Sequence, residues 1–263
     1  MPTLPVFMYH HVNPNKGDMI TVAPEVFEAQ MRHVKEAGFR TLSLDEVAAF
    51  IRGEFKPKER CVAVTFDDGY LDNYVHAWPI LKRYGIKAAV FIVTDWASKA
   101  TASGPPQDLA LIKCPSHQGA KELIAGGQWN KAVLTWAMAR EMRESGLVEF
   151  QSHTATHCLC DAIPFDMLSL ELRSSKQTIE NELGTPCSHL CWPKGRHSKK
   201  AVEMAREAGY SGLFTTRFGT VRPGDGLREI KRIPAKDGVA WFKTRLMIYT
   251  NPVLAGVYAR IKR

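Results

Sequence analysis

Two pairs of side chains in this sequence have the types and spacing of a metal-assisted hydrolytic site. Asp67 and Asp68 directly follow the apolar run 61–66, and His153 and His157 follow the strand-like run 148–151. Two neutral imidazoles and one carboxylate leave open positions on a divalent ion for water and a substrate carbonyl. A second carboxylate beside such an ion can accept a proton. We therefore predict metal-assisted hydrolysis, with these four residues at its centre.

Strands that alternate with helices are expected to position these residues. Buried strands are predicted at 6–9, 61–66, 88–93, 148–151, 189–192 and 212–214. Helices are predicted at 24–37, 45–51, 73–84, 136–144, 165–183 and 198–208. Such alternation over 263 residues indicates an α/β fold with a parallel sheet that closes into a barrel. Catalytic groups lie at the carboxyl ends of barrel strands. After the strand 61–66, Gly69 permits a sharp turn. The two histidines, four residues apart, would share one face of a helical turn.

Two segments depart from this alternation. Residues 97–133 lack a clear element, and we expect an inserted segment that could form a lid over the site. Residues 241–263 carry five basic and no acidic side chains among many apolar ones, so much of the formal net charge of +8 lies there. This composition is typical either of an amphipathic segment at a membrane surface or of a terminal helix with a solvated basic face. We predict one domain over 1–240 and a basic amphipathic tail over 241–263.

Three short motifs resemble those of the polysaccharide deacetylases, which contain the NodB-homology domain and form carbohydrate esterase family 4. The first two are Thr65-Phe66-Asp67-Asp68-Gly69-Tyr70 and Ser152-His153-Thr154-Ala155-Thr156-His157, and the third is Cys191-Trp192-Pro193-Lys194-Gly195. The resemblance extends from about residue 5 to about residue 234. It implies a distorted (β/α) barrel of the NodB-homology type, usually with seven parallel strands.

The resemblance also implies roles for individual residues. Asp67 would be the general base, and a divalent ion, usually Zn²⁺, would be held by Asp68, His153 and His157. A backbone N–H near Lys194 would stabilise the oxyanion. Substrate contacts are expected from Tyr70 and Trp192, and the other tryptophans, Trp96, Trp129 and Trp136, are expected mainly in the core, although one could stack on a sugar ring.

Two departures from the family pattern concern the base and the acid. Cys191 stands where most members have an arginine that holds the catalytic carboxylate, and Arg196 is the nearest substitute. The usual late Leu-x-His motif, which supplies the general acid, is absent. One branch of the family, the poly-N-acetylglucosamine deacetylases, begins with a Tyr-His strand that supplies the acid instead. By this resemblance His10 is the acid, and His11 is the alternative.

These features predict an enzyme that hydrolyses the N-acetyl group of a sugar. The substrate would be a glycan or a lipid-linked glycan precursor in cell-envelope polysaccharide biosynthesis. Residues 1–9 lack a basic region followed by a long apolar stretch, so we expect a cytoplasmic protein that contacts the inner face of the anionic membrane through residues 241–263. An O-acetyl esterase, a sugar deformylase and a non-catalytic carbohydrate-binding barrel remain alternatives. No nucleic-acid-binding motif accompanies the positive charge, so nucleic acid is not an expected partner.

Overall fold

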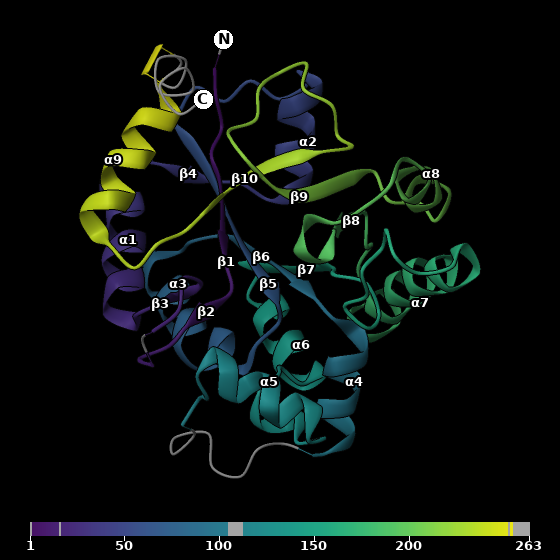
Figure 1. The fold of residues 1–263 in the computed structure, drawn as a ribbon. Coiled ribbons are helices and arrows are strands. Elements are labelled where there is room, and N and C mark those ends of the chain that lie inside the picture. Colours follow the sequence, from purple (N-terminus) through teal and green to yellow (C-terminus); the bar gives the residue numbers. More distant parts are fainter. Residues whose placement is uncertain (1, 16, 105–112, 252, 255–263) are drawn as a thin grey trace.

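The computed structural model describes residues 2–15, 17–104, 113–251 and 253–254, and within them seven parallel strands form a closed ring (Figure 1). Around the ring the strands follow in the order β1 (Val6–Tyr9), β10 (Ile230–Pro234), β9 (Gly212–Phe218), β8 (His189–Cys191), β7 (Val148–Ser152), β6 (Ala88–Ile92) and β5 (Cys61–Asp68), which pairs again with β1. The short β4 (Arg40–Thr41) pairs with the start of β5, and β2 (His11–Val12) pairs with β3 (Thr21–Val22). The predicted distorted α/β barrel is confirmed.

Helices cover the outside and the ends of this ring. They are α1 (Pro24–Glu36), α2 (Leu44–Arg52), α3 (Trp78–Tyr84), α4 (Thr94–Ala102), α5 (His117–Ala125), α6 (Trp136–Glu144), α7 (Phe165–Leu183), α8 (Lys199–Glu207) and α9 (Val239–Thr250). All six helices predicted from the sequence are present, with boundaries close to those expected. The one predicted over 73–84 begins as a π-helical turn, Asn73–Ala77, and continues as α3.

The pattern of β5 explains how the ring is packed. Val62, Val64 and Phe66 point outward and join the core between the ring and the helices. Ala63 points inward, with residues of β6, β8 and β9, into a second core that is closed at one end by α2. Since side chains alternate along a strand, Asp67 also faces the inside of the ring.

Strand β10 was not predicted from the sequence. The run Ile230-Lys-Arg-Ile-Pro is short, has two basic residues at its centre and ends in proline, so it reads as a polar connection. In the structure Ile230 lies in the inner core, Ile233 in the outer core, and Arg232 is fully buried inside the ring. Because the inward-pointing side chain of Arg232 is charged, the sequence pattern did not indicate β10, the strand that closes the barrel.

The segment 97–133 contains more regular structure than predicted. The end of α4, the whole of α5 and a 3₁₀ turn at Trp129–Lys131 lie within it, and residues 105–112 lie outside the described residues. The apolar side chains of this segment form a small core with Tyr70. This packing joins α5 to the end of β5, where the aspartates lie.

The predicted tail begins inside a helix that belongs to the barrel domain. Phe242, Leu246 and Tyr249 of α9 are buried, and the ring of Phe242 lies 4.6 Å from that of Phe7 on β1. Helix α9 lies beside α1 (Figure 1). Residues 252 and 255–263 lie outside the described residues. Among the described residues, no helix combines the length and the apolar character needed to span a bilayer.

Candidate metal and catalytic site

The two aspartates lie at the carboxyl end of β5, as predicted. Asp67 keeps extended backbone and points into the ring, whereas Asp68 adopts a left-handed conformation with φ 73°. Gly69 follows with φ 74°, and a Cβ atom there would lie 2.9 Å from Cγ1 of Ile92. Because the backbone turns at two successive residues, neighbouring side chains that would face opposite sides of a strand both reach one cavity.

His153 and His157 also reach this cavity, but not from a helical turn. Thr154 and His157 have positive φ values of 66° and 64°, so residues 153–157 form a loop with two left-handed residues. The predicted helical presentation of the pair was wrong. The spacing of four residues is nevertheless compatible with one site, because the loop curls back and brings the two imidazole rings to 5.1 Å between centroids.

A buried glutamate of α7 holds this loop in place. One carboxylate oxygen of Glu171 accepts the backbone N–H groups of Ala155 and Thr156, and the other accepts the hydroxyl of Thr156 at 2.7 Å. The hydroxyl of Ser152 accepts the N–H of Thr154. Unusual backbone conformations persist only where their surroundings fix them, and these bonds do so here.

Asp68, His153 and His157 form a cluster suited to a divalent cation. Their ligand atoms lie within 4.8 Å of one another, and Nε2 of each histidine lies 3.3 Å from Oδ1 of Asp68. That oxygen is buried and has no hydrogen-bond partner among the described residues. A buried carboxylate oxygen without a partner is costly unless a ligand satisfies it. The donor set and this oxygen therefore fit a metal ion.

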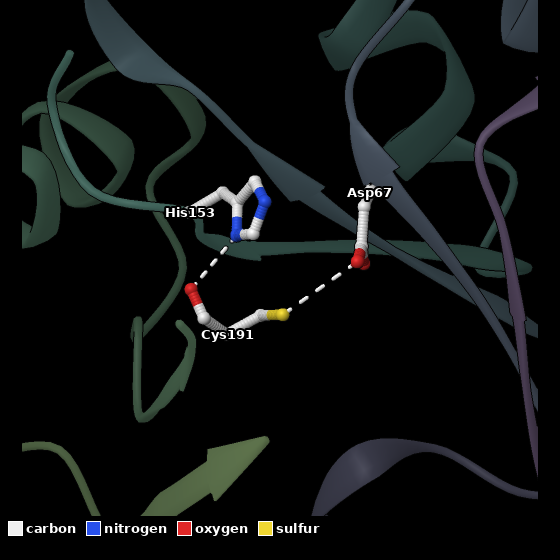
Figure 2. A group of neighbouring side chains, drawn as sticks. All are labelled: Asp67, His153 and Cys191. Atoms are coloured by element: carbon white, nitrogen blue, oxygen red, sulfur yellow. Dashed lines mark hydrogen bonds between the residues drawn. The ribbon is translucent and has the colours of Figure 1, made fainter. Parts of the chain in front are cut away.

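The imidazole of His153 is fixed by the third motif. Its Nδ1 forms a hydrogen bond with the carbonyl oxygen of Cys191, drawn as a dashed line in Figure 2, with a distance of 2.7 Å between the two atoms. A metal-binding histidine commonly donates its other ring N–H to such a carbonyl, which leaves Nε2 free for the ion. Burial alone would raise the pKa of Asp68, but the neighbouring His153 and His157 hold that pKa well below its usual value, so the carboxylate is ionised.

Asp67 is paired with Arg232 rather than with Arg196. Both guanidinium NH groups of Arg232 donate to Asp67, at 2.6 Å to Oδ1 and 2.7 Å to Oδ2. Burial opposes ionisation of Asp67, yet the charge of Arg232 lowers its pKa, so a bidentate pair holds the carboxylate ionised. Arg196 is exposed and bonds Asp161 instead, so the predicted substitution by Arg196 was wrong.

Cys191 occupies the space beside this pair. Its Sγ lies 3.7 Å from Oδ2 of Asp67 (Figure 2) and 2.9 Å from the nearer guanidinium nitrogen of Arg232. Asp67, His153 and Cys191 could be taken for a second metal-binding group. The cation of Arg232 already occupies the position next to Asp67 and Cys191, so a metal ion there would face direct charge repulsion.

The two candidate acids have different environments. His10 lines the cavity, and its Nε2 lies 3.9 Å from Oδ2 of Asp67. Burial lowers the pKa of His10, although Asp67 and Asp68 counteract this effect. His11 is 1% exposed, stacks on Tyr70 and does not line the cavity. Of the two, the structure brings only His10 close to the carboxylate of Asp67.

Tyr70, Lys194 and Trp96 line the cavity, whereas Trp192 does not. The ring of Trp192 is fully buried and stacks on His197 at 5.3 Å, so the expected substrate contact by Trp192 was wrong. The cavity has a volume of about 420 Å³, and it is lined by His10, Ile20, Asp67, Asp68, Tyr70, Trp96, His117, Lys121, Ile124, Ala125, His153, His157, Lys194 and Thr216. Trp129 is half-buried and Trp136 is buried in the core.

The ring and the residues gathered at its carboxyl end place the chain among the α/β-barrel hydrolases. Residues 55–213 match the family model described as polysaccharide deacetylase, and the chain belongs to this family. The family consists of carbohydrate deacetylases, which hydrolyse non-peptide carbon–nitrogen bonds. The resemblance inferred from the three motifs is thereby confirmed.

Several relatives match nearly the whole chain. YxkH of Bacillus subtilis (strain 168), a proposed polysaccharide deacetylase, is 28% identical over 237 residues, which cover 90% of this chain and 73% of the relative. The poly-β-1,6-N-acetyl-D-glucosamine N-deacetylase of Escherichia coli (strain K12) is 28% identical over 94% of this chain, which spans only 36% of that protein. The deacetylase PplD of Streptococcus pyogenes, solved in complex with acetate, superimposes with a TM-score of 0.77 at 25% identity, covering 96% of this chain and 100% of that one.

Arg232 and Glu171 are the site residues that sequence reasoning missed. Both act on other side chains or on the backbone of the site, and neither lies in a motif. The missing arginine in the third motif was the available signal for Arg232, since a buried carboxylate without a cationic partner is costly and the partner then has to come from elsewhere in the chain. Nothing in the sequence distinguishes Glu171 from the other acidic residues of its helix.

Proposed function

We propose that this protein hydrolyses the N-acetyl group of an N-acetylated sugar, with Asp67 as general base. The observation that carries the proposal is the adjacency of an ionised, arginine-paired Asp67 to the cluster of Asp68, His153 and His157. The name of the Escherichia coli relative supports N-acetylglucosamine as the sugar. A glycan precursor of the cell envelope, lipid-linked or polymeric, is the substrate we propose.

Asp68, His153 and His157 would hold the divalent ion, for which we propose Zn²⁺. When bound, such an ion polarises the acetyl carbonyl and makes water more acidic. Asp67 then accepts a proton from the water that attacks the carbonyl carbon. The paired Arg232 keeps Asp67 ionised and oriented for this role.

The remaining steps belong to residues at the cavity wall. We propose that the backbone N–H of Lys194, a residue held at φ 56° where the loop enters the cavity, donates to the developing oxyanion. His10 protonates the leaving amine. Its Nε2 lies 3.9 Å from Asp67, so the proton taken from water has a short route to the imidazole. Breaking the C–N bond then leaves acetate and a free amine.

An assay of the metal-loaded protein on a β-1,6-linked N-acetylglucosamine oligomer tests this proposal. We expect acetate and a new primary amine in equal amounts. Acetate without a new amine on an O-acetylated oligomer would instead indicate an esterase, formate from an N-formylated sugar would indicate a deformylase, and binding without any product would indicate a non-catalytic barrel.

We further propose that the protein works on the cytoplasmic side of an anionic membrane and contacts it through residues 241–263. Lys243 and Met247 of α9 are exposed, Met247 by 56%, while Phe242, Leu246 and Tyr249 of the same helix face the protein. Deleting the tail would remove core side chains, so substitution is the better test. Lys243→Glu should weaken sedimentation with phosphatidylglycerol vesicles, and unchanged sedimentation would contradict the proposal.

A further inference from the structure

A second group of buried polar side chains adjoins the cavity and takes no part in the proposed reaction. Nδ1 of His11 lies 2.6 Å from Oδ2 of Asp72, and Nε2 of His11 lies 3.1 Å from Nδ1 of His117. His11 and Asp72 are 1% and 2% exposed, whereas His117, the first residue of α5, lines the cavity. The chain of contacts therefore runs from the protein interior to the cavity wall.

The contacts of His11 and its protonation state together set which nitrogen of His117 carries a proton. Asp72 acts as an acceptor, because its two oxygens also receive the side-chain N–H groups of Asn13 and Asn73. Nδ1 of His11 is consequently protonated. Burial opposes a charge on His11, but the interaction with Asp72 raises its pKa, which favours protonation of Nε2 as well. With His11 protonated on both nitrogens, its Nε2–H donates to Nδ1 of His117, and the neutral ring of His117 then carries its proton on Nε2.

His117 remains neutral in this arrangement. Burial lowers its pKa, and the neighbouring His11 and Lys121 lower it further, whereas Asp18 and Asp68 act in the opposite direction. The carboxylate of Asp18 is itself occupied, because it accepts the N–H groups of residues 20 and 21 and the hydroxyl of residue 21. Since Nδ1 of His117 is taken by His11, its Nε2–H is the polar group left for the cavity.

Lys121 lies one turn after His117 on the same side of α5, and both side chains line the cavity. Lys121 is exposed, and it forms no ion pair with any residue in the described part of the chain. The imidazole N–H of His117 offers about one donor and the ammonium group of Lys121 about three, and neither group offers a free acceptor. This part of the cavity wall, formed by two side chains that donate, suits an anionic oxygen group, which only accepts.

We propose that His117 and Lys121 form a subsite for an acidic group, a phosphate or a carboxylate, that is carried by the N-acetylated substrate. This inference rests on the proposed deacetylation, because the subsite opens into the same cavity as Asp67. It narrows the substrate to a sugar whose neighbouring group is charged, such as a sugar linked to a diphosphate or to a uronic acid.

Nitrogen-15 NMR of the histidine rings in the metal-free protein tests the subsite without turnover. We expect the Nε2-protonated tautomer of His117 at pH 6.5, and a saturable shift of its ring resonances on addition of inorganic phosphate. Lys121→Gln should weaken phosphate binding about tenfold, a change of about 1.4 kcal/mol. Lys199→Gln, which removes an exposed lysine of α8 outside the cavity, should leave it unchanged. An Nδ1-protonated tautomer, or equal phosphate binding in both variants, would overturn the proposal.

Acetate release distinguishes failure of the subsite from failure of the proposed function. The metal-loaded protein is given UDP-N-acetylglucosamine and the neutral β-1,6-linked oligomer, and the ratio of their kcat/KM values is measured. Lys121→Gln should lower this charged-to-neutral ratio about tenfold through KM. An unchanged ratio would contradict the subsite. No acetate from either substrate would contradict the proposed function, and the phosphate titration would still test the subsite. A parallel titration with glucuronate shows whether the subsite prefers a carboxylate or a phosphate.

Discussion

The candidate site has two halves of different origin. In the half formed by Asp68, His153 and His157, Asp68 is the last residue of β5, and the two histidines lie in the loop that follows β7. The half around Asp67 depends on Arg232, which lies 165 residues further along the chain on β10. The residues of the first half can therefore be recognised from two short sequence motifs, whereas the second half is assembled only when β10 closes the ring. Variants that affect one half but not the other test this division.

The largest effect is expected in the half that would hold the metal. His153→Ala removes one of three ligands and should lower metal affinity by more than about 100-fold, with acetate release falling to background. Metal content after dialysis, measured by inductively coupled plasma spectrometry, checks this result. His33→Ala, a change at a half-buried histidine of α1, is the control and should retain the metal. Full metal retention by His153→Ala would remove His153 from the ligand set.

Arg232→Met should have the next largest effect, because it leaves the buried Asp67 carboxylate without its cation. Loss of one partner of a buried ion pair costs about 3–5 kcal/mol, and the free energy of unfolding in urea should fall by this amount. The pKa of Asp67 should also rise, which moves the acid limb of the kcat/KM profile to higher pH. Arg196→Met breaks only an exposed pair with Asp161 and should cost less than about 1 kcal/mol. Equal losses in the two variants would contradict the assignment of Arg232.

Glu171→Gln should have a smaller effect on the loop that presents the histidines. The amide can accept fewer bonds than the carboxylate, so part of the loop's support is lost, at a cost of about 1–3 kcal/mol in the free energy of unfolding. Metal affinity should fall about tenfold because His153 and His157 are less well positioned. Glu182→Gln, on the same helix but in an exposed pair with Arg140, should alter neither quantity by a comparable amount. The same metal affinity in both variants would show that Glu171 does not position the loop.

The comparison of the two halves also explains which features were predictable. Six strands and the ligand spacing could be read from apolar runs followed by Asp-Asp-Gly and by His-x₃-His, since both signals are local. Strand β10 could not be predicted in this way, because Arg232 is charged and its burial inside the ring depends on its pairing with Asp67. The loop conformation of 153–157 depends on Glu171, which lies on a separate element. The resemblance to the family suggested an arginine but could not locate it on β10.

The smallest effect is expected from the pair of His11 and Asp72 beside the site. Because Asp72 raises the pKa of His11 in the folded protein, the pair contributes stability that is fully present below the unfolded value of about 6.5. This contribution is lost as pH rises through the folded pKa. The stability difference between wild type and Asp72→Asn should therefore decrease between pH 6 and pH 9, as measured by urea unfolding of the metal-free protein. A difference that grows with pH would show that His11 is not the protonated partner.

Asp67→Asn tests the central claim most directly, because Asp67 lies beside the metal-binding cluster without belonging to it. Metal content and acetate release are measured on the same folded preparation. We predict an unchanged metal content and a loss of acetate release of about 10²–10⁴-fold, the range for removal of a general base. Acetate release close to that of the wild type, with the metal retained, would show that Asp67 is not the base.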